Sequence, residues 1–164
     1  ISLFTAINKM AEKYDMPILY SCHPRSRNRL VASGFKLDSR VQVQQPLGFH
    51  DYNWLQMNAF AVVSDSGTLP EESSFYASIG KPISAVCIRT STERPEAIDK
   101  ACFILSGIDT KGLLQSVDLA VQMTKDGNHG IPVPSYTDDV SNKVVKIIQS
   151  YVGVVNKMVW RKEI

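Results

Sequence analysis

The stretch that decides the fold is AFAVVSDSGTLPEE, residues 59–72. Its first five residues are apolar and predict a buried strand, whereas Asp65-Ser66-Gly67 predicts a turn. Pro70 lies near the start of the next pattern and predicts a helix over about 70–79. A strand that passes through a short turn directly into a helix is typical of an α/β protein with parallel strands.

The same alternation extends to both sides of this stretch. Short continuous apolar runs predict further strands, and the segments between them have the periodicity of helices. The short connections predict one Rossmann-like parallel sheet with helices on both faces, followed by a long C-terminal helix. The predicted strands are 17–22, 41–44, 59–63, 83–88 and 102–105, and the predicted helices are 2–15, 27–33, 52–58, 70–79, 95–100, 113–123 and roughly 138–162.

The composition is that of a globular protein with one domain. The chain has 164 residues, of which 44% are hydrophobic and 21% charged, and its formal net charge is +2. This balance excludes collagen-like and disordered classes, and so mild a charge does not favour nucleic acid as a partner. No apolar run approaches the roughly 20 residues that span a bilayer, so we expect no membrane partner. Cys22, Cys87 and Cys102 lack the spacing of a metal site. Cys22 and Cys87 each end an apolar run and are expected to be buried, reduced thiols of a cytoplasmic protein.

The turn at residues 65–67 is the first candidate site. In a parallel sheet such a turn lies at the carboxyl ends of the strands, where ligands bind. The N-terminus of the next helix offers free N–H groups to a phosphate, Ser66 adds a hydroxyl, and Gly67 lets the backbone approach closely. Glu72 could accept two hydrogen bonds from a ribose diol. The alternative is ordinary helix capping, because serine, aspartate and glutamate stabilise a helix start without any ligand.

Two further loops follow predicted strands. Arg94 lies in the polar segment TSTERPE, residues 90–96, where it could meet an anionic substrate; the alternative is a surface salt bridge with Glu93 or Glu96. His23 lies after the first strand and could be a general base or a ligand contact. Its alternative is a structural role, since no carboxylate lies at a fixed spacing from it.

An aromatic segment, PLGFHDYNW at residues 46–54, lies just before the central strand. An aromatic ring beside a nucleotide turn can stack on a base, and Tyr52 is the candidate. The alternative is that these rings belong to the core, which we expect for Trp54 more than for Tyr52. On the 52–58 helix, Trp54, Leu55 and Met57 are expected to face inward.

Four motifs in order resemble a known family: DSG at 65–67, EE at 71–72, GKP at 80–82 and TERPE at 92–96. The sequence is similar to the non-hydrolysing UDP-N-acetylglucosamine 2-epimerases, whose pattern is DSGG-x-x-EE, then GKP, then TERPE. The resemblance covers roughly residues 2–125, and Thr68 replaces the second glycine of DSGG. The helix after Glu72 carries Ser73-Ser74 and is slightly longer than usual. Together with the tail at 140–148 and Val159-Trp160, this resembles the branch that makes UDP-N-acetyl-L-fucosamine and related capsule or O-antigen sugars.

The resemblance implies a fold and a reaction. Residues 1–164 would be one UDP-binding domain, the C-terminal half of a GT-B-like fold, with the long helix within 135–164 crossing to the N-terminal domain. The family inverts C2 of a UDP-N-acetylhexosamine by anti elimination of UDP and its re-addition, without a metal or redox cofactor. The catalytic acid and base would lie on the N-terminal half, so this chain alone is expected to be inactive. A homodimer is expected for the full-length protein.

The resemblance also implies roles for single residues. In the family, a turn before a helix binds the diphosphate and a glutamate binds the ribose. An aromatic ring lies against the uracil, and backbone groups bind the edge of the uracil. A cleft arginine and a histidine near a second UDP-sugar complete the set. These residues are Ser66, Gly67 and Thr68 for the diphosphate, Glu72 for the ribose, Tyr52 and Leu47 for the uracil, Arg94 for the cleft and His23 for the second UDP-sugar. The alternatives are the UDP-binding half of a GT-B glycosyltransferase, which the TERPE segment disfavours, and a non-enzymatic interaction module.

Overall fold

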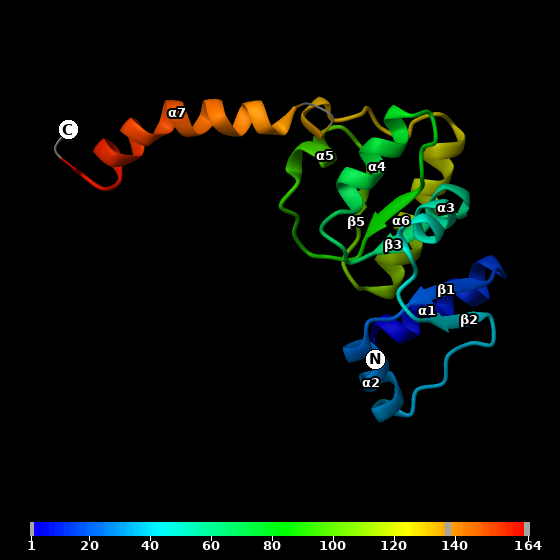
Figure 1. Cartoon of the computed structure of the whole chain (residues 1–164). Helices are drawn as coiled ribbons and strands as arrows, with labels where there is room; N and C mark the ends of the chain where they lie inside the picture. Colours follow the sequence, from blue (N-terminus) through cyan, green and yellow to red (C-terminus); the bar gives the residue numbers. More distant parts are fainter. Residues whose placement is uncertain (1, 137–138, 163–164) are drawn as a thin grey trace. The chain divides into compact units, whose positions relative to one another are not determined.

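The computed structural model describes residues 2–136 and 139–162. The contacts within the chain separate it into two compact units, Ile1–Pro132 and Val133–Ile164. The first unit carries all the described strands and helices α1 to α6, and the second carries a 3-10 helix and helix α7 (Figure 1). Each unit is described by itself.

The order of elements is the predicted alternation of strand and helix. The strands are β1 (Ile18–Ser21), β2 (Val41–Gln44), β3 (Val62–Ser64), β4 (Ala85–Cys87) and β5 (Ile104–Leu105). The helices are α1 (Ser2–Tyr14), α2 (Pro24–Ser33), α3 (Phe49–Asn58), α4 (Leu69–Ser78), α5 (Pro95–Asp99), α6 (Thr110–Lys125) and α7 (Val140–Met158), with the 3-10 helix at Pro134–Tyr136.

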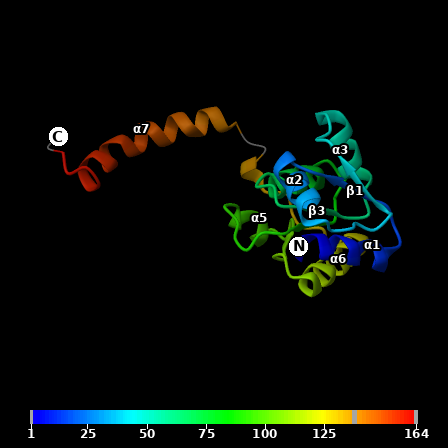
Figure 2. The ribbon, with the colours of Figure 1, turned by 90° about the horizontal axis from the view of Figure 1, so that it is seen from below.

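Strands β3, β4 and β5 form a parallel sheet in that order. All three residues of β4 are buried, and because successive side chains of a strand point to opposite faces, both faces of this sheet are covered. Helix α6 contacts β4 and β5 and packs beside α1 (Figure 2), while α4 contacts β4 and α5. The core centres on Val86, Leu113 and Val117, each at most 1% exposed. The predicted parallel arrangement with helices on both faces is confirmed here.

Strands β1 and β2 form a separate two-stranded parallel sheet. The expectation of one continuous sheet is therefore wrong, because in the described chain no backbone pairing joins β1 to β3. Between them lies a cavity of about 570 Å³, whose lining includes Ile18 and Leu19 from β1 and Val62 and Val63 from β3. Both apolar runs form strands as predicted. The two sheets are separated by the cavity and its lining side chains, and no hydrogen-bonded ladder of the described residues joins them.

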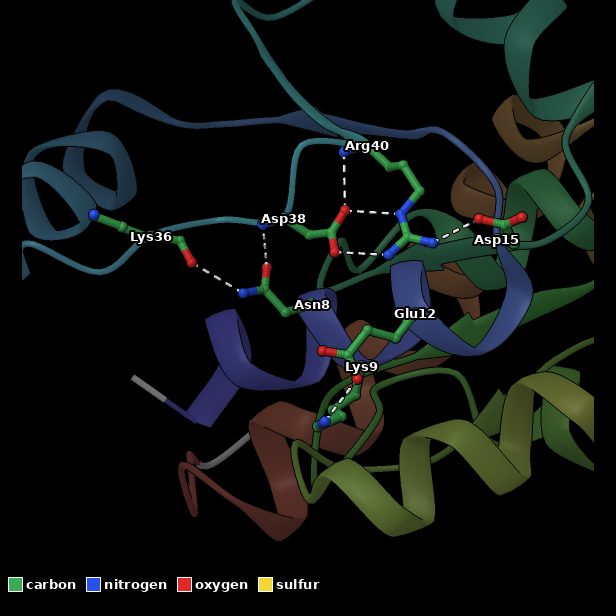
Figure 3. Close-up of polar contacts among 7 residues, drawn as sticks. All are labelled: Asn8, Lys9, Glu12, Asp15, Lys36, Asp38 and Arg40. Carbon is green, nitrogen blue, oxygen red and sulfur yellow. Dashed lines mark hydrogen bonds and ion pairs between the residues drawn. The ribbon is translucent and has the colours of Figure 1, made fainter.

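Charged and amide side chains hold the loop before β2 against α1 (Figure 3). Two guanidinium nitrogens of Arg40 bind the two carboxylate oxygens of Asp38 at 2.8 and 2.7 Å, and the third binds Asp15 at 2.6 Å. Asn8 donates to the Lys36 carbonyl at 3.0 Å and accepts from the Asp38 N–H at 2.8 Å. The Arg40 guanidinium holds the pKa of Asp38 down at about 2.

The three cysteines are buried and free, and burial was expected from the sequence for Cys22 and Cys87. Cys22 follows β1, Cys87 ends β4 and Cys102 precedes β5, and each thiol residue is at most 3% exposed. Within residues 2–136 and 139–162, no helix is long and apolar enough to cross a membrane.

Helix α7 confirms the predicted long C-terminal helix with slightly narrower bounds; part of its predicted start, residue 138, lies outside the described residues. Its apolar residues recur at helical spacing, yet all the described side chains of this helix are at least partly accessible. The stripe is exposed along its whole length, and its members include Val140, Val144, Ile147, Ile148, Tyr151, Val155 and Met158.

Candidate functional site

The predicted turn lies between the end of β3 and the start of α4, at residues 65–68. Helix α4 is fixed beneath it by burial, because Leu69 is fully buried at its first position and Ser73 and Ser74 are at most 2% exposed. The Ser73 hydroxyl donates to the carbonyl of Cys102 at 2.5 Å. The turn therefore stands on a helix that is anchored in the core.

Hydroxyl groups link the turn to the first turn of the helix. The Ser66 hydroxyl accepts from the Thr68 N–H at 3.2 Å and lies 2.8 Å from the Thr68 hydroxyl, which donates to Glu72 Oε1 at 2.8 Å. Thr68 is the N-cap residue, yet among the described atoms its side chain makes no capping hydrogen bond to the helix backbone. Thr68 therefore does not cap the helix through its side chain. Because Pro70 has no N–H and the Leu69 N–H donates to the Ser66 carbonyl at 3.5 Å, this helix start offers an anion fewer backbone donors than usual, and the hydroxyls become more important.

Gly67 lies beside a cation that the sequence analysis missed. A Cβ on Gly67 would lie 3.4 Å from Nη1 of Arg89, so the arginine flanks the turn closely. Arg89 binds both carboxylate oxygens of Glu93, at 3.0 and 2.9 Å, and this pairing lowers the pKa of Glu93. The signal was available, because Arg89 comes two residues after β4, at the same sheet edge as Ser66.

Glu72 lies in a hydrogen-bonded cluster between α3 and α4. Gln56, which is 3% exposed, donates to Glu72 Oε2 at 2.7 Å and to the Tyr52 hydroxyl at 2.9 Å. Partial burial and the Glu72 charge together raise the pKa of Tyr52 to about 12, so the phenol stays protonated. Sequence reasoning did not single out Gln56, because a glutamine on a helix with no clear apolar stripe carries no signal of its own.

The aromatic segment is arranged differently from the expectation. Trp54 is 61% exposed and Met57 is also exposed, so the expectation that they face inward is wrong. Tyr52 is the more buried ring, held by its contact with Gln56. Helix α3 has no sharp apolar face, and the polar cluster with α4, not apolar burial, sets its rotation. Leu47 and Tyr52 both line the 570 Å³ cavity.

Arg94 is held by helix α4. Its Nε lies 2.5 Å from Glu71 Oε1, and its Nη1 donates to the Glu93 carbonyl at 3.2 Å. Glu71 was not among the partners considered from the sequence, where Glu93 and Glu96 were. The ion pair ties the 92–96 segment to the first turn of α4, next to the Ser66 turn.

His23 is the N-cap residue of α2, and its Nδ1 accepts from the Arg25 N–H at 3.3 Å. This is the structural role weighed in the sequence analysis, and a ligand role for His23 stays a prediction. The structure thus joins Ser66, Thr68, Glu72 and Tyr52 through hydrogen bonds, directly or through Gln56. Across the part of the chain that the structure describes, no group of three or more histidine, cysteine or acidic residues is placed to hold a metal ion.

Comparison with known proteins gives the same assignment as the motifs. The family model described as UDP-N-acetylglucosamine 2-epimerase matches residues 1–149. The UDP-N-acetylglucosamine 2-epimerase of Methanococcus maripaludis is 31% identical over 139 residues, which are 78% of this chain and 37% of that protein. The chain therefore spans little more than a third of this relative's length.

Solved structures that resemble this chain come from the same family. The UDP-N-acetylglucosamine 2-epimerase of Rickettsia bellii matches with a TM-score of 0.74 and 32% identity, over 98% of this chain and 43% of that one. The Methanocaldococcus jannaschii UDP-GlcNAc 2-epimerase, solved in complex with UDP-GlcNAc and UDP, matches with a TM-score of 0.71 and 25% identity, over 92% of this chain and 40% of that one. These structures are GT-B-like, which confirms the expected fold class. The chain belongs to the UDP-N-acetylglucosamine 2-epimerase family.

Proposed function

We propose that this chain is the UDP-binding part of a longer UDP-N-acetylhexosamine 2-epimerase. The observation that carries the proposal is the anchored start of α4, where the Ser66–Thr68 turn lies between the Arg89 guanidinium and the Glu72 cluster. A cation, hydroxyls and a helix N-terminus suit a diphosphate, and a carboxylate one turn further suits a ribose.

The ligand would lie along this surface in a defined order. The backbone of Gly67 and Thr68 and the Ser66 hydroxyl hold the diphosphate, and Glu72 accepts from the ribose hydroxyls. Tyr52 and Leu47 receive the uracil, since both line the apolar cavity at the end of the Glu72 cluster. Arg94, which is held by Glu71, is proposed to meet the sugar side of the diphosphate. His23 is assigned to a second UDP-sugar by family resemblance alone.

The proposed reaction inverts C2 of the sugar. A base removes the C2 proton while the C1–O bond to UDP breaks, which forms a 2-acetamidoglucal and free UDP. UDP then adds back to C1, and a proton adds to C2 from the opposite face. Atoms and charges balance in this scheme without a metal or a redox step. This chain stabilises the leaving diphosphate, because charge that develops there meets Arg89 and the N-terminus of α4.

The proton-transfer groups are proposed to come from outside residues 1–164, so the chain by itself should bind UDP without epimerising a UDP-sugar. We further propose that α7 packs its apolar stripe on that other part of the polypeptide. The whole protein is proposed to be a cytoplasmic homodimer that serves the synthesis of capsule or O-antigen sugars, and the three reduced thiols agree with a reducing compartment.

Calorimetric titration of the chain with UDP and with uridine tests the site. We expect one UDP per chain. Gly67→Val should weaken UDP binding far more than Ser66→Ala, because its branched side chain would occupy the space through which the phosphate must approach the backbone. Ser66→Ala, which removes only one hydroxyl, should cost about 1 kcal/mol. Uridine, which lacks phosphate, should be much less sensitive to either change. A chain that binds no UDP, or a folded Gly67→Val variant that binds it normally, would refute the proposal.

A further inference from the structure

Gln56 is a buried polar side chain at the centre of the candidate site. It lies on α3, one helical turn after Tyr52, and is 3% exposed. A primary amide buried to this extent destabilises a protein unless its donors and acceptor are paired. Its hydrogen bonds therefore decide what the residue contributes.

The Gln56 amide is held at both ends. Its oxygen accepts from the Tyr76 hydroxyl at 2.8 Å, and its nitrogen donates to Glu72 Oε2 at 2.7 Å and to the Tyr52 hydroxyl at 2.9 Å. The Tyr76 hydroxyl has one hydrogen and lies within hydrogen-bond distance of both the Gln56 oxygen and Asn53 Oδ1, whereas the two hydrogens of the Gln56 nitrogen point to Glu72 and Tyr52. Both hydrogens of the Gln56 nitrogen are thus used on residues assigned to the nucleoside.

The same cluster fixes Glu72 from both sides. Thr68 donates to one carboxylate oxygen at 2.8 Å, and Gln56 donates to the other. Each oxygen keeps a further lone pair, so the carboxylate is oriented and can still accept from a ligand. A hydrogen bond to an ionised group is stronger than a neutral one, so the loss of Gln56 would free the carboxylate to rotate.

We propose that Gln56 is a positioning residue that sets the selectivity of the site for a ribonucleotide, by orienting the Glu72 carboxylate towards the ribose hydroxyls and Tyr52 towards the base. The proposal rests on the proposed function, in which Glu72 meets the ribose. Gln56 itself need not touch the ligand. Tyr76 acts one step further away and more weakly, because its hydroxyl contacts Asn53 as well as the Gln56 oxygen.

The test compares UDP, 2′-deoxy-UDP and inorganic diphosphate as ligands of the chain, by calorimetry. The wild-type chain should prefer UDP over 2′-deoxy-UDP by at least about tenfold, the effect of one hydrogen bond to a charged group. Gln56→Met, which keeps the side-chain volume and removes the amide, should reduce this ratio to about threefold or less. Tyr76→Phe should reduce it by a smaller factor.

Two controls separate positioning from loss of structure. Affinity for inorganic diphosphate, which has no nucleoside, should stay unchanged in Gln56→Met. Gln122→Met removes a glutamine that pairs with Asp126 on the surface of α6, and it should leave all three affinities unchanged. A double variant, Gln56→Met with Glu72→Gln, should show the same ratio as Glu72→Gln alone, because the two changes remove one shared interaction.

The outcomes are distinguishable. If the wild-type chain binds no UDP, the proposed function and this inference both fail. If it binds UDP and Gln56→Met keeps the wild-type ratio while remaining folded by circular dichroism, the inference alone fails. If Gln56→Met weakens inorganic diphosphate and UDP equally, Gln56 only supports the fold, and the positioning role is overturned. Where Gln56→Met does not fold, Gln56→Glu serves in its place, because a second carboxylate should displace Glu72 and reduce the ratio in the same way.

Discussion

Helix α2 follows β1 and helix α4 follows β3, and each begins after a short polar turn, but the two helices meet the core differently. None of the described residues of α2 is buried, whereas α4 buries Leu69, Pro70, Ser73, Ser74 and Tyr76. The His23 side chain caps α2 by accepting from a backbone N–H, whereas Thr68 turns its hydroxyl towards Glu72. A helix that is held by packing can leave its N-terminal donors to a ligand, while an exposed helix needs them capped.

The largest difference between helices α2 and α4 should be in their contribution to stability. Leu69→Ala removes a fully buried side chain from α4 and should lower the free energy of unfolding by about 2–5 kcal/mol. Val31→Ala on α2, where the side chain is 75% exposed, should change it by no more than about 0.5 kcal/mol. Urea unfolding followed by circular dichroism measures both values. Equal losses would show that α2 packs in solution as α4 does.

The next effect concerns the ligand. Glu72→Ala should weaken UDP binding by about 1–3 kcal/mol, because it removes a charged acceptor from the ribose site. Asn28→Ala, on the exposed surface of α2, should leave UDP affinity unchanged. Calorimetry with UDP checks both variants. If Glu72→Ala binds UDP with unchanged affinity, Glu72 only stabilises the start of helix α4 and does not bind the ribose.

The smallest expected effect is a loss of stability at low pH that is confined to the β1–β2 region. The pKa of Asp38 is held at about 2 by Arg40, below the ordinary value of about 3.9 for aspartate. The native state therefore binds fewer protons than the unfolded state between about pH 4 and pH 2. The stability that this pair contributes is present above pH 4 and is lost as the pH falls through 2.

Unfolding of wild type and Arg40→Gln between pH 5 and pH 2 tests this pH dependence. Wild type should lose stability more steeply over this range than the variant, because Asp38 of the variant keeps only the backbone N–H of residue 40 as a donor and its pKa is lowered less. Hydrogen exchange should place the loss at β2 and leave β4 protected, because β4 is covered on both faces. Parallel pH curves for the two proteins would contradict the assignment.

Local patterns in the sequence predicted the elements well. The proline after Asp65 placed the turn and α4 nearly where the structure has them, and β2 was predicted with its observed bounds. The strand expected at 59–63 is observed at Val62–Ser64 and is only partly buried, and Ala59 and Phe60 are exposed outside it. Helix α2 begins three residues earlier than predicted, because Pro24 occupies its first turn. These features depend on neighbours in the chain, which periodicity and turn residues report directly.

What the sequence could not predict depends on partners far along the chain. The absence of backbone pairing between β1 and β3 could not be predicted from periodicity, because each strand has an apolar run of its own. The contact of Arg89 with the Gly67 turn and the bond from Gln56 to Glu72 join residues 22 and 16 positions apart. Trp54 was placed wrongly because apolar character alone was used, where a polar cluster decides how α3 is rotated.

The three buried cysteines can report how often different regions of the molecule open. A thiol reagent reaches a buried cysteine only when the segment around it opens, so the labelling rate reports the frequency of that opening. Cys87, in the covered strand β4, should react only on global unfolding. Cys22 is equally buried, but it lies between a two-stranded sheet and a helix that buries no described residue, so it should react sooner. Burial raises the pKa of Cys102, which reduces its reactive thiolate at any given pH. Labelling of the unmodified chain therefore times the opening of its separate regions without any added probe.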